Sequence, residues 1–142
     1  MVIGIECRTS NNPDAGPHDI PRHWQRFYTE NILSQIPSKA ESEVIALYCD
    51  YEGDYTKPYS LVIGCQVTSI RKIPEGMVAK IVPASTYAVF RAVGEFPKSL
   101  IETWKKIWQT NLERTYTGDF EVHGERSSKE VGVYIAIKEG TQ

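Results

Sequence analysis

The sequence predicts an α+β fold: two β-α-β-β modules, related by a pseudo-twofold axis, form one antiparallel sheet. Two main helices lie on one face of that sheet, with a groove between them. Two observations predict this arrangement. Strand-like and helical segments follow one another in the same order twice. In addition, Trp24 and Trp104 lie on the two predicted helices, each of which is preceded by one strand and followed by two.

The first module spans about residues 1–70. It opens with a strand in VIGIECRTS, and NNPDAGPHD is typical of a loop because it is rich in Asn, Pro, Gly and Asp. We expect a helix to begin near Asp19, whose side chain can cap free backbone N–H groups, with Pro21 in its first turn and Pro37 at its end. SEVIALYCDY and PYSLVIGCQVTSI then predict two strands separated by a polar turn.

The second module spans about residues 84–139 and follows a short strand in MVAKIVPAS. TYAVFRAVG predicts a strand that ends at Gly94. Ser99 and Glu102 form the S-x-x-E pattern of a capping box at the start of a helix. The apolar stripe of this helix comprises Ile101, Trp104, Trp108 and Leu112. DFEVHGE and EVGVYIAI predict a closing hairpin, so we interpret residues 1–142 as a single domain.

Composition and charge exclude several function classes. The formal net charge of −2 argues against direct nucleic-acid binding, which needs a basic stripe. No apolar run approaches the ~18 residues needed to cross a bilayer, so we expect no membrane partner. The N-terminus lacks the pattern of a secretion signal. Cys7, Cys49 and Cys65 contain no CxxC pair, which fits a reducing compartment, and we therefore expect a cytoplasmic protein.

The sequence contains no strong motif for catalysis, a metal or a cofactor. His18, His23 and His123 do not share a metal-ligand spacing, so we expect no metal. There is no GxSxG elbow, no P-loop and no GxGxxG pattern. We accordingly expect no cofactor and assign no catalytic residue.

Glu121 is the most informative single residue. It lies in the middle of a strand, so Phe120 and Val122 share one face of the sheet while Glu121 and His123 share the other. The pattern alone favours a charge on a solvent-facing surface. The alternative is a carboxylate at the floor of the groove. Burial there is costly unless hydrogen bonds or a cationic ligand compensate.

The aromatic content is high, with 8 Tyr, 4 Phe and 3 Trp. A single tyrosine is more often a packing residue, but several rings around a carboxylate could form a box for cations, each ring face attracting a cation by ~0.5–2 kcal/mol. Tyr59 and Tyr134 are the better candidates because they lie in strands expected to be central. Trp104 and Trp108 lie one helical turn apart, where they belong to the core or line the edge of the groove.

A series of segments in a fixed order resembles the effector-binding domain of bacterial transcription activators of the AraC type. This is the gyrase-inhibitor-like family, which includes the multidrug-sensing domains of efflux regulators. The segments are GIECRTSN, IPRHWQRF, ALYCDYEGDYTKPYSLVIG, IVPASTYAVFRAVGEFP, TWKKIWQT, RTYTGDFEVHG and VGVYIAI. The resemblance covers essentially the whole chain, and it extends to stand-alone domains carried on integron gene cassettes.

The resemblance implies two strand–helix–strand–strand modules and a pocket that binds organic cations between aromatic rings and an acidic residue. The role of the acid carries over to Glu121, on the strand written DFEVH, which reverses the preference for a solvent-facing side chain. The matching aromatic positions are Tyr48, Tyr59, Phe96, Trp104 and Tyr134. Trp108 from the helical stripe completes the predicted ligand-binding set.

Regulators of this family attach the domain to a helix-turn-helix DNA reader, whereas here Met1 falls almost directly before the first strand. We therefore expect a non-enzymatic receptor for amphipathic organic cations, without its own DNA-binding domain, acting as a monomer or homodimer. It would sequester its ligand or act through a regulator protein. Two alternatives stay open. One is a protein-interaction module that regulates a transcription factor or gyrase, and the other is a hydrolase of reactive small molecules.

Overall fold

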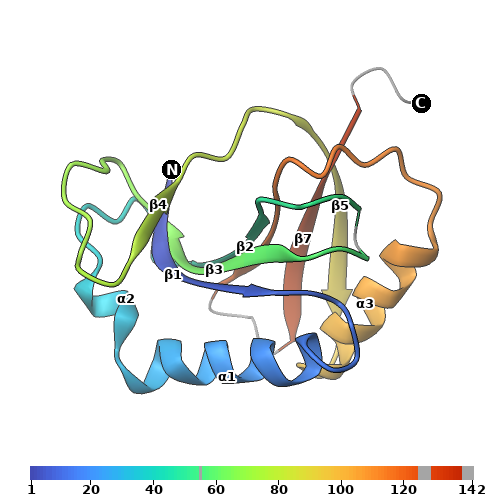
Figure 1. The fold of residues 1–142 in the computed structure, drawn as a ribbon, viewed down its shortest axis with the longest axis horizontal. Helices are drawn as coiled ribbons and strands as arrows, with labels where there is room; N and C mark the ends of the chain where they lie inside the picture. The colour runs from blue at the N-terminus through green and yellow to red at the C-terminus, as the bar shows by residue number, and fades with distance from the viewer. Residues whose placement is uncertain (55, 125–128, 139–142) are drawn as a thin grey trace.

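A repeated strand–helix–strand–strand order organises the fold (Figure 1). The computed structural model describes residues 1–54, 56–124 and 129–138. The elements are β1 Val2–Thr9, α1 Gly16–Thr29, α2 Ile32–Gln35, β2 Val44–Cys49, β3 Tyr59–Gln66, β4 Val78–Lys80, β5 Thr86–Val93, α3 Lys98–Gln109, β6 Asp119–His123 and β7 Glu130–Ile137. Residues 126–128 of the predicted loop between the last two strands, and the predicted end of the second module, fall outside the described residues.

The strands form one antiparallel sheet in the order β4-β1-β3-β2-β6-β7-β5. From the centre of the sheet outward, one half contains β2, β3 and β1, and the other half contains β6, β7 and β5. In each half the order is the second, the third and then the first strand of the module, as a twofold axis requires. The halves join where β2 pairs with β6, from Val44 opposite His123 to Tyr48 opposite Asp119. Glu121 lies in the middle of this pairing, opposite Ala46, and is therefore next to the axis.

The two long helices pack on the same face of the sheet, which confirms the predicted fold class. From α1, Phe27 is buried against β1 and β3, whereas Leu100 and Ile107 of α3 are buried against β7. Trp104 contacts both of these clusters and so lies at their boundary. On the opposite face, a third cluster is partly covered by Val82, in the segment that connects β4 to β5 (Figure 1).

No helix in the described ranges is long and apolar enough to cross a membrane.

The predicted start of the first helix was wrong by one turn. The carbonyl of Asn12 accepts hydrogen bonds from Ala15 and Gly16, and this turn leads into α1 at Gly16. Asp19 lies inside the first turn and caps no backbone group. Its carboxylate accepts a hydrogen bond from the Thr9 hydroxyl at 2.8 Å, which ties α1 to the end of β1.

Two other helix boundaries also differ from the prediction. Ser99 does not form a capping box, because α3 begins one residue earlier and the Ser99 hydroxyl points back to the carbonyl of Gly94 at 3.5 Å. The first helix does not continue to Pro37. Asn31 adopts a left-handed conformation with φ 52°, which asparagine tolerates better than most residues, and this separates α1 from α2.

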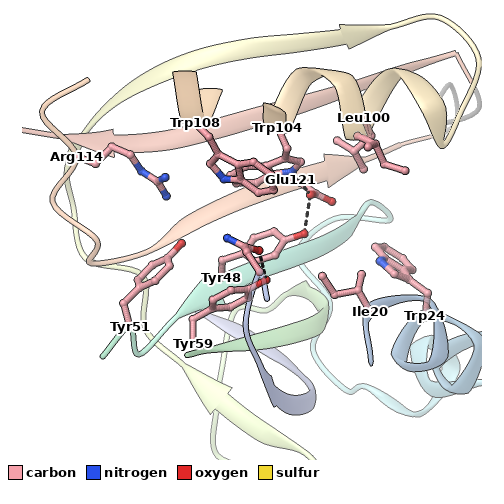
Figure 2. A pocket seen from close by; sticks show the side chains of 12 residues that line it. Ile20, Trp24, Tyr48, Tyr51, Tyr59, Leu100, Trp104, Trp108, Arg114 and Glu121 are labelled. Carbon is pink, nitrogen blue, oxygen red and sulfur yellow. Dashed lines mark hydrogen bonds between the residues drawn. The ribbon is translucent and has the colours of Figure 1, made fainter. Parts of the chain in front are cut away.

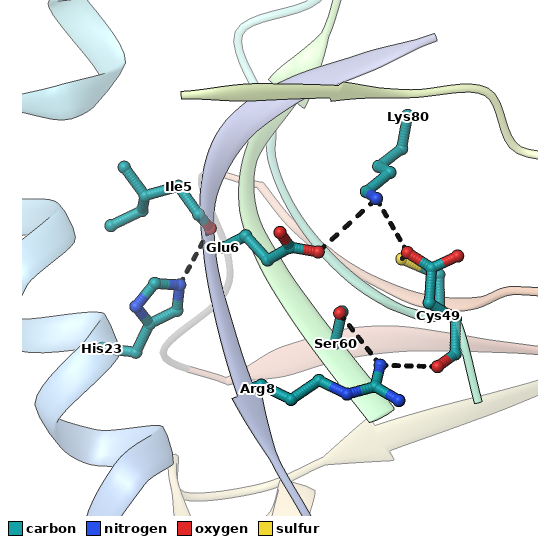
Figure 3. A network of polar contacts seen from close by, with 8 residues as sticks. Ile5, Glu6, Arg8, His23, Cys49, Ser60 and Lys80 are labelled. Atoms are coloured by element: carbon teal, nitrogen blue, oxygen red, sulfur yellow. Dashed lines mark hydrogen bonds and ion pairs between the residues drawn. The ribbon is translucent and has the colours of Figure 1, made fainter. Parts of the chain in front are cut away.

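Polar contacts hold β1 on both faces of the sheet (Figure 3). On the helical face, Nε2 of His23 lies 2.8 Å from the carbonyl oxygen of Ile5, and burial lowers the pKa of this histidine. On the opposite face, Lys80 forms ion pairs with Glu6 at 3.5 Å and with Asp50 at 2.7 Å. These contacts fix α1 and β4 relative to β1, so the wall of the groove that α1 forms has a defined position.

The facing glycines Gly4 and Gly64 generate the first testable prediction. They lie opposite each other in β1 and β3, and a Cβ on Gly64 would lie 2.6 Å from the Cα of Gly4. Gly64→Ala must therefore push the strands apart, and we expect it to lower the free energy of unfolding by about 1–3 kcal/mol in urea denaturation. Gly118→Ala is the control, because its Cβ would meet side chains at ordinary distances of 3.8 Å or more. Equal stability of the two variants would contradict the close approach.

Candidate ligand-binding site

A cavity of about 170 Å³ lies between the two long helices, above the centre of the sheet (Figure 2). Its walls come from α1 on one side and α3 on the other, and its floor comes from β2, β3 and β6. The lining residues are Asn11, Ile20, Trp24, Tyr48, Tyr51, Tyr59, Leu100, Ile101, Trp104, Trp108, Arg114 and Glu121. Most of them are aromatic or aliphatic. The groove expected from two paired modules is therefore present.

Glu121 is buried at the floor of the cavity, with 1% of its surface exposed. One carboxylate oxygen, Oε2, accepts hydrogen bonds from the Tyr48 hydroxyl and from the indole N–H of Trp104, both at 2.7 Å. The other oxygen, Oε1, lies 2.8 Å from Nε2 of His123. Among the residues that the structure describes, no lysine or arginine pairs with this carboxylate. The three contacts stabilise the negative charge, and the contact with His123 is an ion pair only when the imidazole is protonated.

Strand periodicity explains why three polar side chains meet in this place. Asp119, Glu121 and His123 alternate along β6, so all three point to the helical face, and all three are buried. The ring of His123 is enclosed by Trp24 of α1, with centroids 4.8 Å apart, and by Phe96, with centroids 5.9 Å apart. The orientation of the imidazole toward Glu121 is thus fixed by aromatic packing.

A second buried acid lies next to an arginine at the other end of the cavity. Asp119 is fully buried and forms an ion pair with Nη2 of Arg114 at 2.7 Å. It also accepts hydrogen bonds from the Tyr51 hydroxyl at 2.5 Å and from the backbone N–H of Ala136 at 2.8 Å. The guanidinium of Arg114 stacks over the ring of Tyr116, 4.4 Å from its centre. The charge of this acid is therefore matched within the protein.

Burial keeps the tyrosines of the cavity in their neutral form. It raises the pKa of Tyr48 well above the ordinary value, and the neighbouring charge on Glu121 raises that pKa further. Burial, followed by the charge on Asp119, has the same effect on the pKa of Tyr51. Burial also raises the pKa of Tyr59. The hydroxyls of Tyr48 and Tyr51 donate hydrogen bonds to Glu121 and Asp119, respectively, and the Tyr59 hydroxyl donates to Oδ1 of Asn11 at 2.8 Å.

The structure brings together most of the side chains in the predicted ligand-binding set. Glu121, Tyr48, Tyr59, Trp104 and Trp108 all line the cavity. Tyr48 and Trp104 touch the carboxylate directly, and the ring of Tyr48 lies 5.6 Å from that of Tyr59 and 5.1 Å from that of Trp104.

Tyr134 and Phe96 do not line the cavity. Tyr134 lies opposite Phe120 in the register of β7 with β6, and the two rings stack 4.7 Å apart on the other face of the sheet. Its neighbour Val133 is the residue that points toward the helices. Phe96 precedes α3 and is 40% exposed, and it reaches the site only through its contact with His123.

Several lining residues were not predicted from the sequence. Ile20 and Trp24 lie four residues apart on α1, so helical spacing could have placed both on the wall of the groove. Asp119 does not line the cavity itself but pairs with Arg114, and its place two residues before Glu121 puts it on the same face. Arg114 lies between α3 and β6, outside any regular element, where no periodicity indicates a direction.

The model of the family Cass2, integron-associated effector binding protein, matches residues 1–137. The chain belongs to this family. The match confirms the resemblance to an integron-associated effector-binding domain. The Cass2 chain is also 32% identical over 145 residues to the putative transcriptional regulator protein YobU of Bacillus subtilis strain 168, an alignment that covers 95% of this chain and 90% of YobU.

Solved structures that are similar to this protein include an integron cassette protein and SAV2435. The integron cassette protein VCH_CASS2 from the mobile metagenome of Vibrio cholerae is 31% identical, with a TM-score of 0.77 over 96% of this chain and 89% of that one. SAV2435 bound to tetraphenylphosphonium is 22% identical, with a TM-score of 0.67 over 97% of this chain and 88% of that one. At this identity, the second likeness shows the shared fold alone.

The raised pKa values of the cavity tyrosines predict a loss of stability at alkaline pH. An unfolded tyrosine titrates near pH ~10, so above this pH the unfolded chain releases protons that the folded Cass2 protein keeps. The contribution of these tyrosines to the free energy of unfolding is therefore complete below about pH 10. It decreases as the pH rises above this value, by up to about 1.4 kcal/mol per pH unit for each tyrosine. Urea denaturation between about pH 8 and pH 11 measures this slope. Tyr48→Phe must make it shallower, and an unchanged slope would contradict the burial of this hydroxyl.

Proposed function

We propose that this protein is a receptor for amphipathic organic cations, in which Glu121 supplies the counter-charge and aromatic rings supply the walls. One observation carries the proposal. A carboxylate that is 1% exposed lies at the floor of an aromatic cavity and has no lysine or arginine partner among the described residues. Because the hydrogen bonds to this carboxylate offset only part of the cost of burying its charge, a cation that enters the cavity gains a strong attraction.

The two buried acids support this proposal by their different surroundings. Asp119 is paired with Arg114, so the pair as a whole carries no net charge. Glu121 is instead held by hydrogen bonds from Tyr48 and Trp104 and by its contact with His123, and no lysine or arginine among the described residues matches its negative charge. In an environment that excludes water, this charge acts on a ligand more strongly than it would at the protein surface. The cavity therefore favours cations over neutral and anionic compounds of the same shape.

The aromatic walls support a broad rather than a narrow choice of ligands. Trp104 and Trp108 of α3 present neighbouring rings, with centroids 6.4 Å apart, on one side of the cavity. Tyr59 lies on the floor, and Trp24 lies on the wall that α1 forms. Flat rings attract cations and apolar groups without demanding one shape. We expect binding in the micromolar range, about −8 kcal/mol.

The comparisons support the same class of ligand and a regulatory role. SAV2435, which shares the fold, is described as bound to tetraphenylphosphonium, an organic cation. YobU is named a putative transcriptional regulator. We propose that binding of a cation by this protein serves regulation, as the effector step of a response that another protein carries out.

A hydrolytic role has less support from the geometry. His123 is the residue that would act with Glu121 as an acid–base pair, but its ring is packed between Trp24 and Phe96. The carboxylate already contacts three hydrogen-bonding groups of the protein. A general base needs access to the proton that it removes. These contacts favour a fixed counter-charge over a proton-transfer group.

The charge on Glu121 can be tested with Glu121→Gln. We expect the dissociation constant for tetraphenylphosphonium to rise at least about tenfold, because the counter-charge is removed while the side-chain shape is kept. Binding of neutral triphenylphosphine oxide should change by less than about twofold. Isothermal titration calorimetry measures both constants, and ligand-dependent shifts of the melting temperature provide an independent reading.

Glu102→Gln is the matched control for this experiment. Glu102 is exposed on α3, so its substitution changes the net charge of the protein equally without altering the cavity. An equal loss of affinity for the cationic and the neutral compound in Glu121→Gln would refute the counter-charge role. Absence of any cation-dependent stabilisation of the unmodified protein would favour the protein-interaction alternative.

The aromatic wall can be tested with Trp108→Leu. We expect the dissociation constant for tetraphenylphosphonium to rise by about 3- to 30-fold, because the ring face of tryptophan attracts a cation and the leucine side chain does not. Tyr87→Leu is the control: it removes an aromatic ring that packs against Phe120 and Tyr134 on the other face of the sheet, outside the cavity, and should change the constant by less than about twofold. Equal effects of the two substitutions would show that the rings act through packing rather than through the cavity.

A further inference from the structure

Arg114 has unsatisfied hydrogen-bond donors at the end of the cavity beside Tyr51 and Trp108 (Figure 2). Its side chain is only 5% exposed, and Nη2 donates to Asp119. The other two nitrogens, Nε and Nη1, are buried and have no hydrogen-bond acceptor among the described residues. A guanidinium carries five N–H donors, and a buried donor without an acceptor is costly. The cavity thus contains a donor group as well as the acid.

The charge of this arginine is already matched by the ion pair with Asp119 at 2.7 Å. A second carboxylate would be repelled by Asp119 and would lose its hydration on entering the cavity. A neutral oxygen acceptor meets neither penalty and still satisfies the free N–H groups. The chemistry of this end of the cavity therefore favours a carbonyl oxygen.

We propose that the ligand is an organic cation that also carries a neutral carbonyl group, and that Arg114 donates hydrogen bonds to this carbonyl while Glu121 faces the cationic centre. This inference rests on the proposed function and narrows its ligand class. The two groups line one cavity, and a row of rings connects them. Tyr48 contacts Tyr59 at 5.6 Å, and Tyr59 contacts Tyr51 at 5.7 Å between centroids. The acid and the arginine thus lie along one aromatic surface of the cavity, where a single aromatic ligand contacts both.

A matched pair of ligands tests the proposal on the unmodified protein. Both are tetraphenylphosphonium ions with one substituent at the para position of one ring: an acetyl group in the first and an isopropenyl group in the second. The two substituents have nearly the same shape, but only acetyl has an oxygen acceptor. We expect the acetyl compound to bind about tenfold more tightly in titration calorimetry. A carbonyl buried without a donor would instead weaken binding, so the sign of the difference decides.

The outcomes separate this inference from the proposed function. If both phosphonium ions bind and the acetyl compound has no advantage, the role of Arg114 is refuted and the cation receptor stands. If neither ion binds, the proposed function fails and this inference fails with it. A para carboxylate analogue that bound more tightly than the acetyl compound would refute the preference for a neutral acceptor.

A double variant tests whether Arg114 causes the preference for the acetyl compound over the isopropenyl compound. Arg114→Met combined with Asp119→Asn removes both members of the ion pair, so no unpaired charge stays buried. We expect the ratio of the two dissociation constants to fall to about one or to reverse. Arg114→Lys keeps the charge beside Asp119 but lacks the Nε–H donor, so it should lower the ratio of the two dissociation constants. This variant provides the test if the double variant does not fold. Arg71→Met, at an exposed position outside the cavity, is the control and must keep the ratio. A ratio that stays near ten in both Arg114 variants would overturn the proposal.

Discussion

The buried carboxylate of Glu121 is the constraint on which the rest of the site depends. Its negative charge is tolerated at 1% exposure because donors reach it from different parts of the fold: Tyr48 from β2 in the first module, Trp104 from α3 in the second, and His123 from its own strand. The Tyr48 contact crosses between the modules and forms only when they are docked at the β2–β6 pairing, whereas the Trp104 contact lies within the second module. Completion of the site therefore depends on the pairing of the two modules.

The surroundings of the two acids on β6 explain how one cavity combines a negative centre with an unsatisfied donor. Asp119 and Glu121 point to the same face, two residues apart, yet only Asp119 has a cationic partner. Arg114 lines the cavity and uses one nitrogen for this ion pair, which leaves two buried nitrogens without an acceptor among the described residues. Glu121 receives hydrogen bonds and a histidine contact instead. The cavity is consequently polarised along its length, with the acid and the arginine at different positions.

Periodicity and element order were enough to predict the fold, because strand alternation and helical spacing are local properties of the chain. They could not predict whether Glu121 lies on the face of the sheet that the helices cover or on a solvent-facing surface. Alternation tells which residues share a face, but the packing of α1 and α3 determines which face is covered. The same limit accounts for Tyr134, whose register opposite Phe120 turns it away from the helices. Helix starts were misplaced because turns such as the one at Asn12 replaced the expected side-chain caps. Arg114 lies in an irregular segment, where the sequence carries no directional signal.

Glu121 breaks the pseudo-twofold symmetry at the centre of the sheet. Around the axis, Ala46 takes the place in the first module that Glu121 takes in the second, and the two residues lie opposite each other. Side chains at directly opposed positions have Cβ atoms about 4.5–5.5 Å apart, so two carboxylates there would repel each other. A small, fully buried alanine avoids this repulsion. Duplicated elements thus build the groove, whereas the charge that selects a ligand arises from a difference between the two halves.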